Sequence, residues 1–177
     1  RWNQGNYHGQ GTFKYADGSS YKGQWSNGVQ QGSGTFTYTN GSRYKGQWSD
    51  GNFHGQGTFV YAEGGRYKGQ WLHGIPDGQG EFKYADGSRY KGSFAQGLPQ
   101  GQGKLSYANG TAYEGQFVAG TIRGQGIFTH KDGSVATGQF SDGIQQGTGT
   151  LTYPSGAVYS GAFLEGTPHG QGEYAFP

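Results

Sequence analysis

The chain has 177 residues, of which 39 are glycine and 16% are aromatic, and it contains neither cysteine nor methionine. The aromatic content is too high for a disordered glycine-rich linker, and the lack of cysteine excludes disulfides and thiolate metal sites. The formal net charge is only +2, so it selects no class of partner, and no apolar run is long enough to span a bilayer.

The sequence repeats itself with a period of 23 residues from one end to the other. The pentad YKGQW begins at Tyr21 and returns at Tyr44 and Tyr67. The first glycine of a Gly-x-Gly motif recurs without insertion or deletion at Gly9, Gly32, Gly55, Gly78, Gly101, Gly124, Gly147 and Gly170. A fixed period of this length is typical of repeat architectures, in which each unit packs against its neighbours.

The aromatic residues follow the same period. Of the 29 aromatic residues, 27 occupy four slots of the repeat, and the two exceptions, Tyr7 and Phe53, lie in the loop. The tyrosine slot that contains Tyr21 is broken only at Ala136. The rings therefore serve the repeat as a whole and do not mark one local site.

Each repeat predicts a β-hairpin. Tyr21, Gly23 and Trp25 alternate with polar Lys22 and Gln24, a pattern that indicates a strand with one covered and one solvated face. Dipeptides that favour tight turns join successive hairpins at Asp17-Gly18, Asn40-Gly41, Asp86-Gly87, Asn109-Gly110 and Asp132-Gly133. The other turn, residues 26–31 around Gly28, is expected to be longer. The result is an antiparallel meander.

The glycines between the aromatic residues predict how the rings pack. A single-layer sheet has no second layer to cover its rings, so each ring must lie over its own sheet. A glycine on the neighbouring strand leaves space for a ring, because it has no side chain.

The repeated unit Tyr-x-Gly-x-Trp/Phe-x-x-Gly-x-x-x-Gly-x-Gly-x-Phe-x-Tyr-x-Asp-Gly resembles the MORN (membrane occupation and recognition nexus) repeat, from residue 1 to Phe176. The resemblance implies an all-β fold: an elongated, twisted, single-layer antiparallel meander of about eight β-hairpins. It also implies that the chain is not an enzyme, and that it binds proteins or anionic phospholipids. A cytoplasmic or membrane-peripheral location agrees with the family, while the absence of cysteine is also compatible with export.

The domain organisation follows from the repeat. We expect residues 1–177 to form a single array whose first repeat is truncated at its N-terminal end. Because the chain lacks methionine, we expect this array to be a segment of a longer protein.

Two slots depart from the family pattern. The histidine that precedes Gly-x-Gly in the family is kept as His8, His54 and His169, and is replaced by Gln31, Asp77, Gln100, Arg123 and Gln146. The glutamate that often follows the strand tyrosine is replaced by Lys22, Lys45, Lys68 and Lys91.

No residue pattern indicates catalysis, a metal site or a cofactor. Successive repeats lie about 10 Å apart in a sheet, so histidines of one slot cannot share a metal ion. We expect a histidine such as His54 to hydrogen-bond its own turn. The Gly-x-Gly motifs lead into strands and lack a Walker lysine, which excludes a phosphate cradle.

Cations gather on the predicted polar face and form what we call the basic ladder: Lys22, Arg43, Lys45, Arg66, Lys68, Arg89 and Lys91. One hypothesis is that the ladder binds anionic lipid head groups, at about 1 kcal/mol per cation. The alternative is a solvated face that discourages edge pairing, screened by the nearby Asp17, Glu63 and Asp86. Nucleic acid is disfavoured, because the rings lie on the opposite face from the cations.

The opposite face, here called the ring face, is the predicted partner-binding surface: Tyr21, Trp25, Phe36, Tyr38, Tyr44, Trp48, Phe59, Tyr61, Tyr67 and Trp71. The first hypothesis is a non-catalytic scaffold that binds a protein partner or positions a neighbouring domain through this face. The alternative to this scaffold is the lipid-binding function of the basic ladder, and a second alternative is glycan or cell-wall binding by aromatic stacking on the ring face. The open sheet edges also predict end-to-end association into homo-oligomers.

Overall fold

A computed structural model describes residues 2–3 and 6–177, with side chains from Tyr7 onward, and every regular element in it is a strand. The strands are β1 (Trp2–Asn3), β2 (Asn6–Tyr7), β3 (Gly9–Lys14), β4 (Ser20–Ser26), β5 (Val29–Thr37), β6 (Arg43–Ser49), β7 (Asn52–Val60), β8 (Arg66–Leu72), β9 (Ile75–Lys83), β10 (Arg89–Ala95), β11 (Leu98–Ser106), β12 (Ala112–Val118), β13 (Thr121–Thr129), β14 (Val135–Ser141), β15 (Ile144–Thr152), β16 (Val158–Leu164) and β17 (Thr167–Ala175). Among the described residues no helix is available to cross a membrane.

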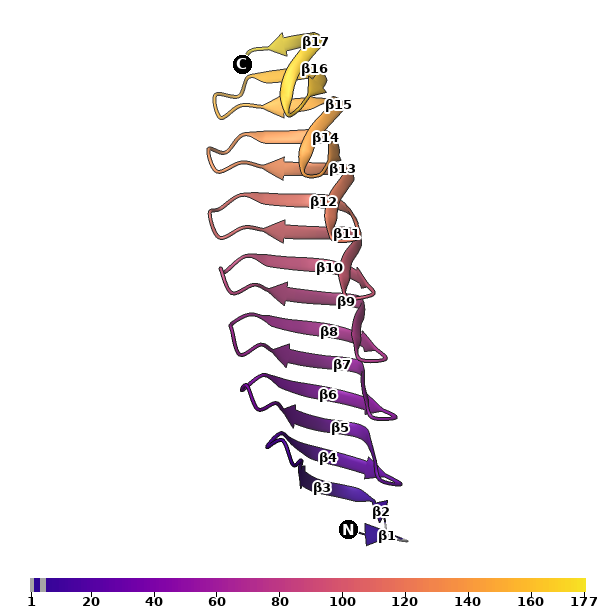
Figure 1. The fold of residues 1–177 in the computed structure, drawn as a ribbon. Helices are drawn as coiled ribbons and strands as arrows, with labels where there is room; N and C mark the ends of the chain where they lie inside the picture. The colour runs from indigo at the N-terminus through magenta and orange to yellow at the C-terminus, as the bar shows by residue number, and fades with distance from the viewer. Residues whose placement is uncertain (1, 4–5) are drawn as a thin grey trace. The chain divides into compact units, whose positions relative to one another are not determined.

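Strands β3 to β17 form one open antiparallel sheet in which the strands follow chain order, and β1 and β2 form a separate pair. This confirms the predicted all-β meander. The chain divides into two compact units, residues 1–86 and 87–177. Figure 1 shows that each unit consists of successive hairpins. The predicted single array over 1–177 stays a prediction, and its truncated start at Arg1 lies outside the described residues.

Hairpin β4–β5 shows how the repeat is built. Tyr21 is opposite Phe36 and Gly23 is opposite Gly34, but the next pair is Trp25 with Gln30, so β5 carries two extra residues. This bulge falls at Gly32, which has a φ of 66°, and the side-chain Oε1 of Gln24 accepts a hydrogen bond from the Ser33 N–H at 2.9 Å. The bulge bends the strand and glycine permits its left-handed backbone.

The prediction of turn lengths was wrong. The turn over residues 26–31 was expected to be the longer one and the Asp-Gly turn the tight one, and the structure shows the reverse. The turn expected to be long needs only Asn27 and Gly28, because both adopt positive φ (49° and 83°), the geometry of a type I′ hairpin. The Asp-Gly turn is the wider one: Tyr15 N–H donates to the Ser19 carbonyl at 2.9 Å. In it Asp17 accepts from the Ser19 N–H at 2.8 Å, an Asx turn that wraps the chain around the carboxylate.

The core is made of tyrosine rings that lie on glycines. A Cβ atom at Gly23 would lie 2.6 Å from Cζ of Tyr21, and one at Gly34 would clash with the same ring. Tyr21 is fully buried and its hydroxyl donates to the Gln24 carbonyl at 3.0 Å. The arrangement recurs at Tyr44, Tyr67, Tyr90, Tyr113 and Tyr159. The predicted packing of rings over glycines is confirmed.

Tryptophan and phenylalanine cover the tyrosines from both sides. The Trp25 and Trp48 rings meet the Tyr21 ring edge-on, with centroids at 5.0 and 4.9 Å. In the second unit Phe94 and Phe117 meet Tyr90 in the same way, at 5.0 and 4.9 Å. Edge-to-face pairs contribute about 1 kcal/mol each beyond the area they bury, so the ring face carries the packing of the fold.

The sheet order ends at β3 and β17. Every residue of β17 is exposed, including Tyr174 at 53%. An exposed strand is a template for pairing with another chain. End-to-end association through these edges stays a prediction, and light scattering over a range of concentrations tests it.

Candidate functional site

The ten predicted residues of the ring face lie together on the first unit at two depths. Six are buried and form its floor: Tyr21, Tyr44 and Tyr67 at 0% exposed, and Trp25, Trp48 and Trp71 at 5–7%. Phe36 and Phe59 are half-buried, while Tyr38 and Tyr61 are 36% and 37% exposed. A partner on this face would touch these last four residues first.

The half-exposed rings form a continuous row, which we call the Phe/Tyr stripe: Phe36, Tyr38, Phe59, Tyr61, Phe82 and Tyr84. Within it Phe36 and Tyr38 have centroids 4.6 Å apart, and Tyr38 lies 5.7 Å from Phe59. Phe59 contacts Tyr61 at 4.5 Å. These contacts hold the rings in fixed positions, so a ligand would find a preformed surface.

Two depressions lie beside the stripe. One, of about 210 Å³, is lined by Phe36, Tyr38, Trp48 and Phe53 among others. The other, of about 400 Å³, is lined by Tyr7, Phe13, Tyr15 and Trp25 with Gly28 and Gln30. Gln30 lines both depressions. The smaller depression has room for single side chains of a partner, and the larger one lies at the low end of the range of pockets that bind small molecules.

Sequence reasoning missed one slot of the ring face. Phe53 was assigned to a loop, yet its ring stacks on Tyr44 at 3.8 Å, and Tyr7 packs on Trp25 at 5.3 Å. The same slot holds Gln30, Phe53, Pro76, Pro99, Ile122, Gln145 and Pro168. The slot was concealed because the turn before it was expected to be long, whereas the turn has only two residues and the strand starts directly after it. Two signals were available: the distance of two periods between Tyr7 and Phe53, and the even spacing of Phe53 from Gly57 and Phe59.

Tyrosines and tryptophans supply the polar groups of the ten ring-face residues. The indole N–H groups of Trp25, Trp48 and Trp71 are buried and have no hydrogen-bond partner within the part of the chain that the structure describes. Burial raises the pKa of Tyr38 and, to a smaller extent, so does the neighbouring Tyr61 phenol. Burial also raises the pKa of Tyr61, so both phenols stay protonated and can donate hydrogen bonds to a ligand at neutral pH.

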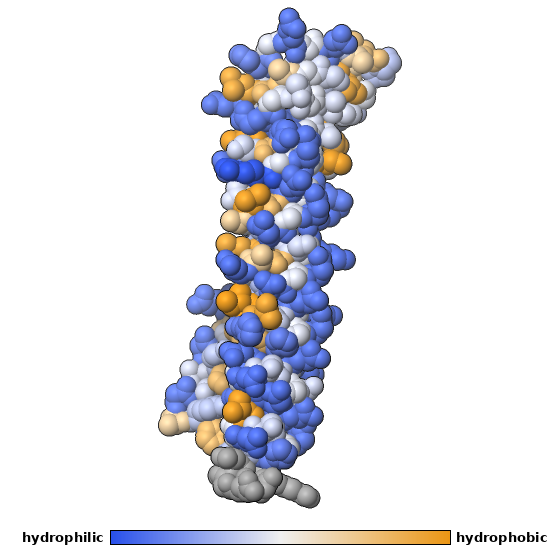
Figure 2. Space-filling model, turned by 90° about the vertical axis from the view of Figure 1, so that its right-hand side faces the viewer, coloured by the Kyte–Doolittle hydropathy of each residue, from blue (hydrophilic) through white to orange (hydrophobic). Residues whose placement is uncertain are grey.

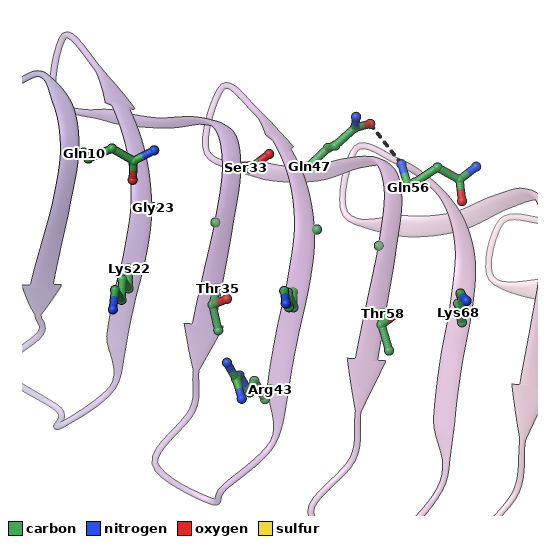
Figure 3. Close-up of a pocket in the computed structure, with 14 residues that line it drawn as sticks. Gln10, Lys22, Gly23, Ser33, Thr35, Arg43, Gln47, Gln56, Thr58 and Lys68 are labelled. Atoms are coloured by element: carbon green, nitrogen blue, oxygen red, sulfur yellow. Dashed lines mark hydrogen bonds between the residues drawn. The ribbon is translucent and has the colours of Figure 1, made fainter.

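The basic ladder lies on the polar face. In the first unit Lys22, Arg43, Lys45 and Lys68 line an open groove of about 820 Å³, and Arg66 lies on the same strand as Lys68. Figure 3 shows Lys22, Thr35, Thr58 and Lys68 at one level, on β4, β5, β7 and β8, with Gln10, Ser33, Gln47 and Gln56 at the next level. Arg89 and Lys91 lie on β10 of the second unit. The groove itself was not predicted.

The acidic residues expected to screen the ladder lie in turns. Asp17, Glu63 and Asp86 each fall between strands, outside the lining of the groove. The Asp17 carboxylate accepts hydrogen bonds from Ser19, which lower its pKa below the usual range. These three carboxylates therefore do not line the groove beside the cations of the basic ladder, and they can screen its charge only from the turns.

The family histidine slot links neighbouring repeats. Gln31 Oε1 accepts from the Asp50 N–H at 2.9 Å, and Arg123 forms an ion pair with Asp142 at 3.7 Å. His54 lies 6.3 Å, between ring centroids, from His73 in the following turn. The Gln31 and Arg123 side chains thus reach the next turn. The hydrogen bond expected from His54 to its own turn stays a prediction. In the part of the chain that the structure describes, no three metal-ligating residues come together.

Aliphatic side chains that the sequence analysis did not single out flank the two-residue turns. Leu72 and Ile75 are 44% and 47% exposed in the first unit, and Leu98, Val118 and Ile144 are 45–49% exposed in the second. Figure 2 shows hydrophobic patches that alternate with hydrophilic ones on the face it presents. The patches are small and separate, so they do not form a single apolar surface.

An open meander of hairpins with a tyrosine on six of its glycine pairs among the described residues defines a β-repeat protein. The MORN repeat matches residues 1–20, 21–43, 44–66, 67–89, 90–112, 113–135, 137–158 and 159–177. The chain therefore belongs to the MORN-repeat family. None of the curated proteins compared with it matches its sequence.

Solved structures of similar fold include TCP domains of SAS-4 (dCPAP) and CPAP. The TCP domain of SAS-4 (dCPAP) from Drosophila melanogaster, solved with a proline-rich motif of Ana2 (dSTIL), is 16% identical with a TM-score of 0.51 over 95% of this chain and 90% of that chain. The TCP10 domain of Danio rerio CPAP, solved with a STIL peptide, is 15% identical with a TM-score of 0.48 over 85% of this chain. This chain covers 63% of the Danio rerio chain. At such identities the likeness concerns the fold alone.

Proposed function

We propose that this chain is a non-catalytic interaction scaffold whose ring face, in the first unit, binds a segment of a partner protein. The observation that carries the proposal is the Phe/Tyr stripe beside two depressions. Tyr38 and Tyr61 are each more than a third exposed although their rings are held by aromatic neighbours. Rigid, half-exposed aromatic residues are enriched at the centres of protein interfaces.

An extended segment fits this surface better than a globular partner. The depressions are narrow and are separated by Gln30, so separate side chains of one strand or polyproline II segment can enter each. Grooves lined by aromatic residues bind such segments, because the rings provide apolar contact and the phenols donate to backbone carbonyls. The Drosophila TCP domain, which shares the fold, was solved with a proline-rich motif, which agrees with this mode of binding.

A peptide library displayed on phage tests the proposal. We expect enriched peptides that bind the wild-type chain and lose at least about tenfold in affinity to the double variant Tyr38→Lys/Tyr61→Lys, because the variant places charges on the stripe. Val29→Lys is the matched control, since Val29 is 41% exposed and lies outside the stripe. A library that enriches nothing, or peptides that bind the double variant and the wild type equally, would contradict the proposal.

The glycan alternative uses the same surface, and one observation limits it. Sugar rings stack on open aromatic faces, but Trp25, Trp48 and Trp71 are only 5–7% exposed, which leaves the stripe tyrosines for stacking. Titration with neutral oligosaccharides separates the two functions. The glycan function would be favoured if the wild type binds an oligosaccharide, the Tyr38→Lys/Tyr61→Lys variant does not, and the phage library enriches no peptide.

A further inference from the structure

The polar-face groove of the first unit presents positive charge along a lining that contains no acidic residue among those the structure describes. It is lined by Lys22, Arg43, Lys45 and Lys68 with glutamine, serine, threonine and glycine, and by no Asp or Glu among the described residues. Within the same part of the chain none of these four cations forms an ion pair. A groove of this kind is complementary to an anion.

Cross-strand neighbours keep the lysines apart from acidic groups. Lys22 lies between Thr12 and Thr35. Lys45 lies between Thr35 and Thr58. Only Lys68 has an acidic cross-strand neighbour, Glu81, and it lies at the end of the groove. The threonine hydroxyls beside each lysine can donate hydrogen bonds to the same ligand.

The spacing of the lysines specifies the form of the ligand. Lys22, Lys45 and Lys68 are on β4, β6 and β8, and every second strand of a sheet is about 9.6 Å away. A polyproline II segment has three residues per turn and rises about 3.1 Å per residue, so residues three apart lie on one side at about 9.3 Å. A β-strand places same-side residues about 6.6 Å apart, and a helix needs seven residues to rise about 10.5 Å.

The groove also suits the backbone of such a segment. Polyproline II has no internal hydrogen bonds, so its carbonyl groups need donors from solvent or from a partner. Ser33, Gln47 and Gln56 line the groove in a row beside the lysines (Figure 3). Gln47 Oε1 accepts from the Gln56 N–H at 3.0 Å, which fixes the Gln47 amide and leaves its NH₂ group to donate.

We propose that this groove binds an acidic protein segment in polyproline II conformation, with a carboxylate at every third residue. Each carboxylate would meet one of Lys22, Lys45 and Lys68, and Arg43 would meet a fourth acidic group or a backbone carbonyl. The site lies on the opposite face from the Phe/Tyr stripe, so it is a second binding surface and does not depend on the function proposed for the first.

Two peptide isomers test the register. Fluorescence anisotropy at low salt should show Glu-Pro-Pro-Glu-Pro-Pro-Glu binding about tenfold more tightly than Glu-Glu-Glu-Pro-Pro-Pro-Pro, because only the first places its carboxylates at the lysine spacing. Lys45→Gln should weaken the spaced peptide about fivefold. Lys104→Gln makes the same change in charge in the second unit, where Lys104 is already paired with Glu114 at 3.2 Å, and should leave binding unchanged.

Three results would overturn the proposal. The first is no binding of the spaced peptide, and the second is equal binding of the two isomers, which would show attraction to net charge alone. The third concerns lipid, which the basic ladder was predicted to bind. If phosphatidylcholine vesicles containing phosphatidylserine bind in a Lys45-dependent manner and the spaced peptide does not displace them, the groove serves a membrane surface. The Tyr38→Lys/Tyr61→Lys variant should bind the spaced peptide like the wild type.

Discussion

Gln30 in the first unit and Gln145 in the second occupy the same slot of the repeat, yet their side chains lie in different surroundings. Gln30 is half-buried and its Nε2 donates to the Tyr15 hydroxyl at 2.7 Å. Gln145 is only 5% exposed, and its Nε2 donates to the carbonyls of Thr137 at 3.1 Å and Thr150 at 3.3 Å. One residue type thus serves as a surface group in one unit and as a core group in the other.

The tyrosine slot explains the difference. Tyr21 covers its glycine pair in the first unit, whereas the corresponding residue beside Gln145 is Ala136. The Gln145 amide then occupies the vacant place: a Cβ at Gly138 would lie 3.4 Å from its Nε2. A glycine pair therefore needs a flat group over it, and a planar amide that satisfies two strand carbonyls replaces a ring.

The largest expected effect tests whether a glutamine can rescue a missing ring in the first unit. Tyr67→Ala should cost about 4 kcal/mol of unfolding free energy, because it leaves a cavity beside Pro76, which cannot fill it. Tyr21→Ala should cost roughly 1 to 2 kcal/mol less, because Gln30 can turn inward as Gln145 does and form hydrogen bonds with strand carbonyls. Urea unfolding followed by tryptophan fluorescence measures both.

The rescue has its own controls. The double variant Tyr21→Ala/Gln30→Ala should lose as much unfolding free energy as Tyr67→Ala, because no glutamine is left to fill the vacant place. Conversely, adding Pro76→Gln to Tyr67→Ala should restore part of the lost stability. If Tyr21→Ala and Tyr67→Ala lose the same unfolding free energy, the vacant tyrosine place does not draw the glutamine inward. The position of the Gln145 side chain would then be set by the local backbone of its own repeat.

The second prediction concerns the glycines under the rings. Gly57→Ala should cost about 3 kcal/mol, because its Cβ would lie 2.6 Å from the Tyr44 ring carbons. Gly11→Ala is the matched control in the same slot: its Cβ would meet only Trp25, at an ordinary contact distance of 3.5 Å. Thermal unfolding should therefore show a large drop for the first variant and little change for the second. Similar drops in both would mean that strand conformation, not the ring, requires the glycine.

The third prediction is a loss of stability at alkaline pH, centred on the tyrosines of the first unit. Burial raises the pKa of Tyr21 and of Tyr67 to about 12, and it raises the pKa of Tyr44 well above its usual range. The unfolded chain releases these protons first, at a pH of about 10, so stability is complete below that pH and falls as the pH rises toward 12. The loss should be about 1 kcal/mol per tyrosine at a pH of about 11.

The midpoints of urea unfolding at neutral pH and at a pH of about 11 measure this loss. Tyr67→Phe keeps the ring and removes the ionisable hydroxyl, so its midpoint should fall less between neutral and alkaline pH than that of the wild type. A variant that loses as much as the wild type would show that other groups, such as the lysines of the basic ladder, cause the alkaline effect.

The period, the hairpins and the packing of rings on glycines could all be predicted, because each depends on contacts that recur every 23 residues. One feature that was missed depends on a single departure from the repeat. The Gln145 side chain fills its place only because Ala136 leaves it vacant, and alternation alone cannot show such a compensation. Phe53 was missed because the turn before it needs only Asp50 and Gly51, so β7 begins at Asn52 and places Phe53 opposite Trp48 on the ring face. The cations of the basic ladder could be placed on one face from the alternation, but the alternation does not show the groove that four of them line.

The smallest expected effect concerns the tryptophans of the first unit, whose place is taken by phenylalanine in the second. Trp48 and Phe117 pack alike, each with its ring 4.9 Å from a buried tyrosine, but the Trp48 indole N–H has no acceptor among the described residues. Trp48→Phe loses apolar area and also removes an unpaired donor, which costs about 1 to 3 kcal/mol when buried. The two terms should cancel to within about 1 kcal/mol. The reverse change, Phe117→Trp, adds volume and an unpaired donor together, so it should destabilise the second unit, and a stabilised Phe117→Trp in urea unfolding would show that the indole N–H gains a partner there.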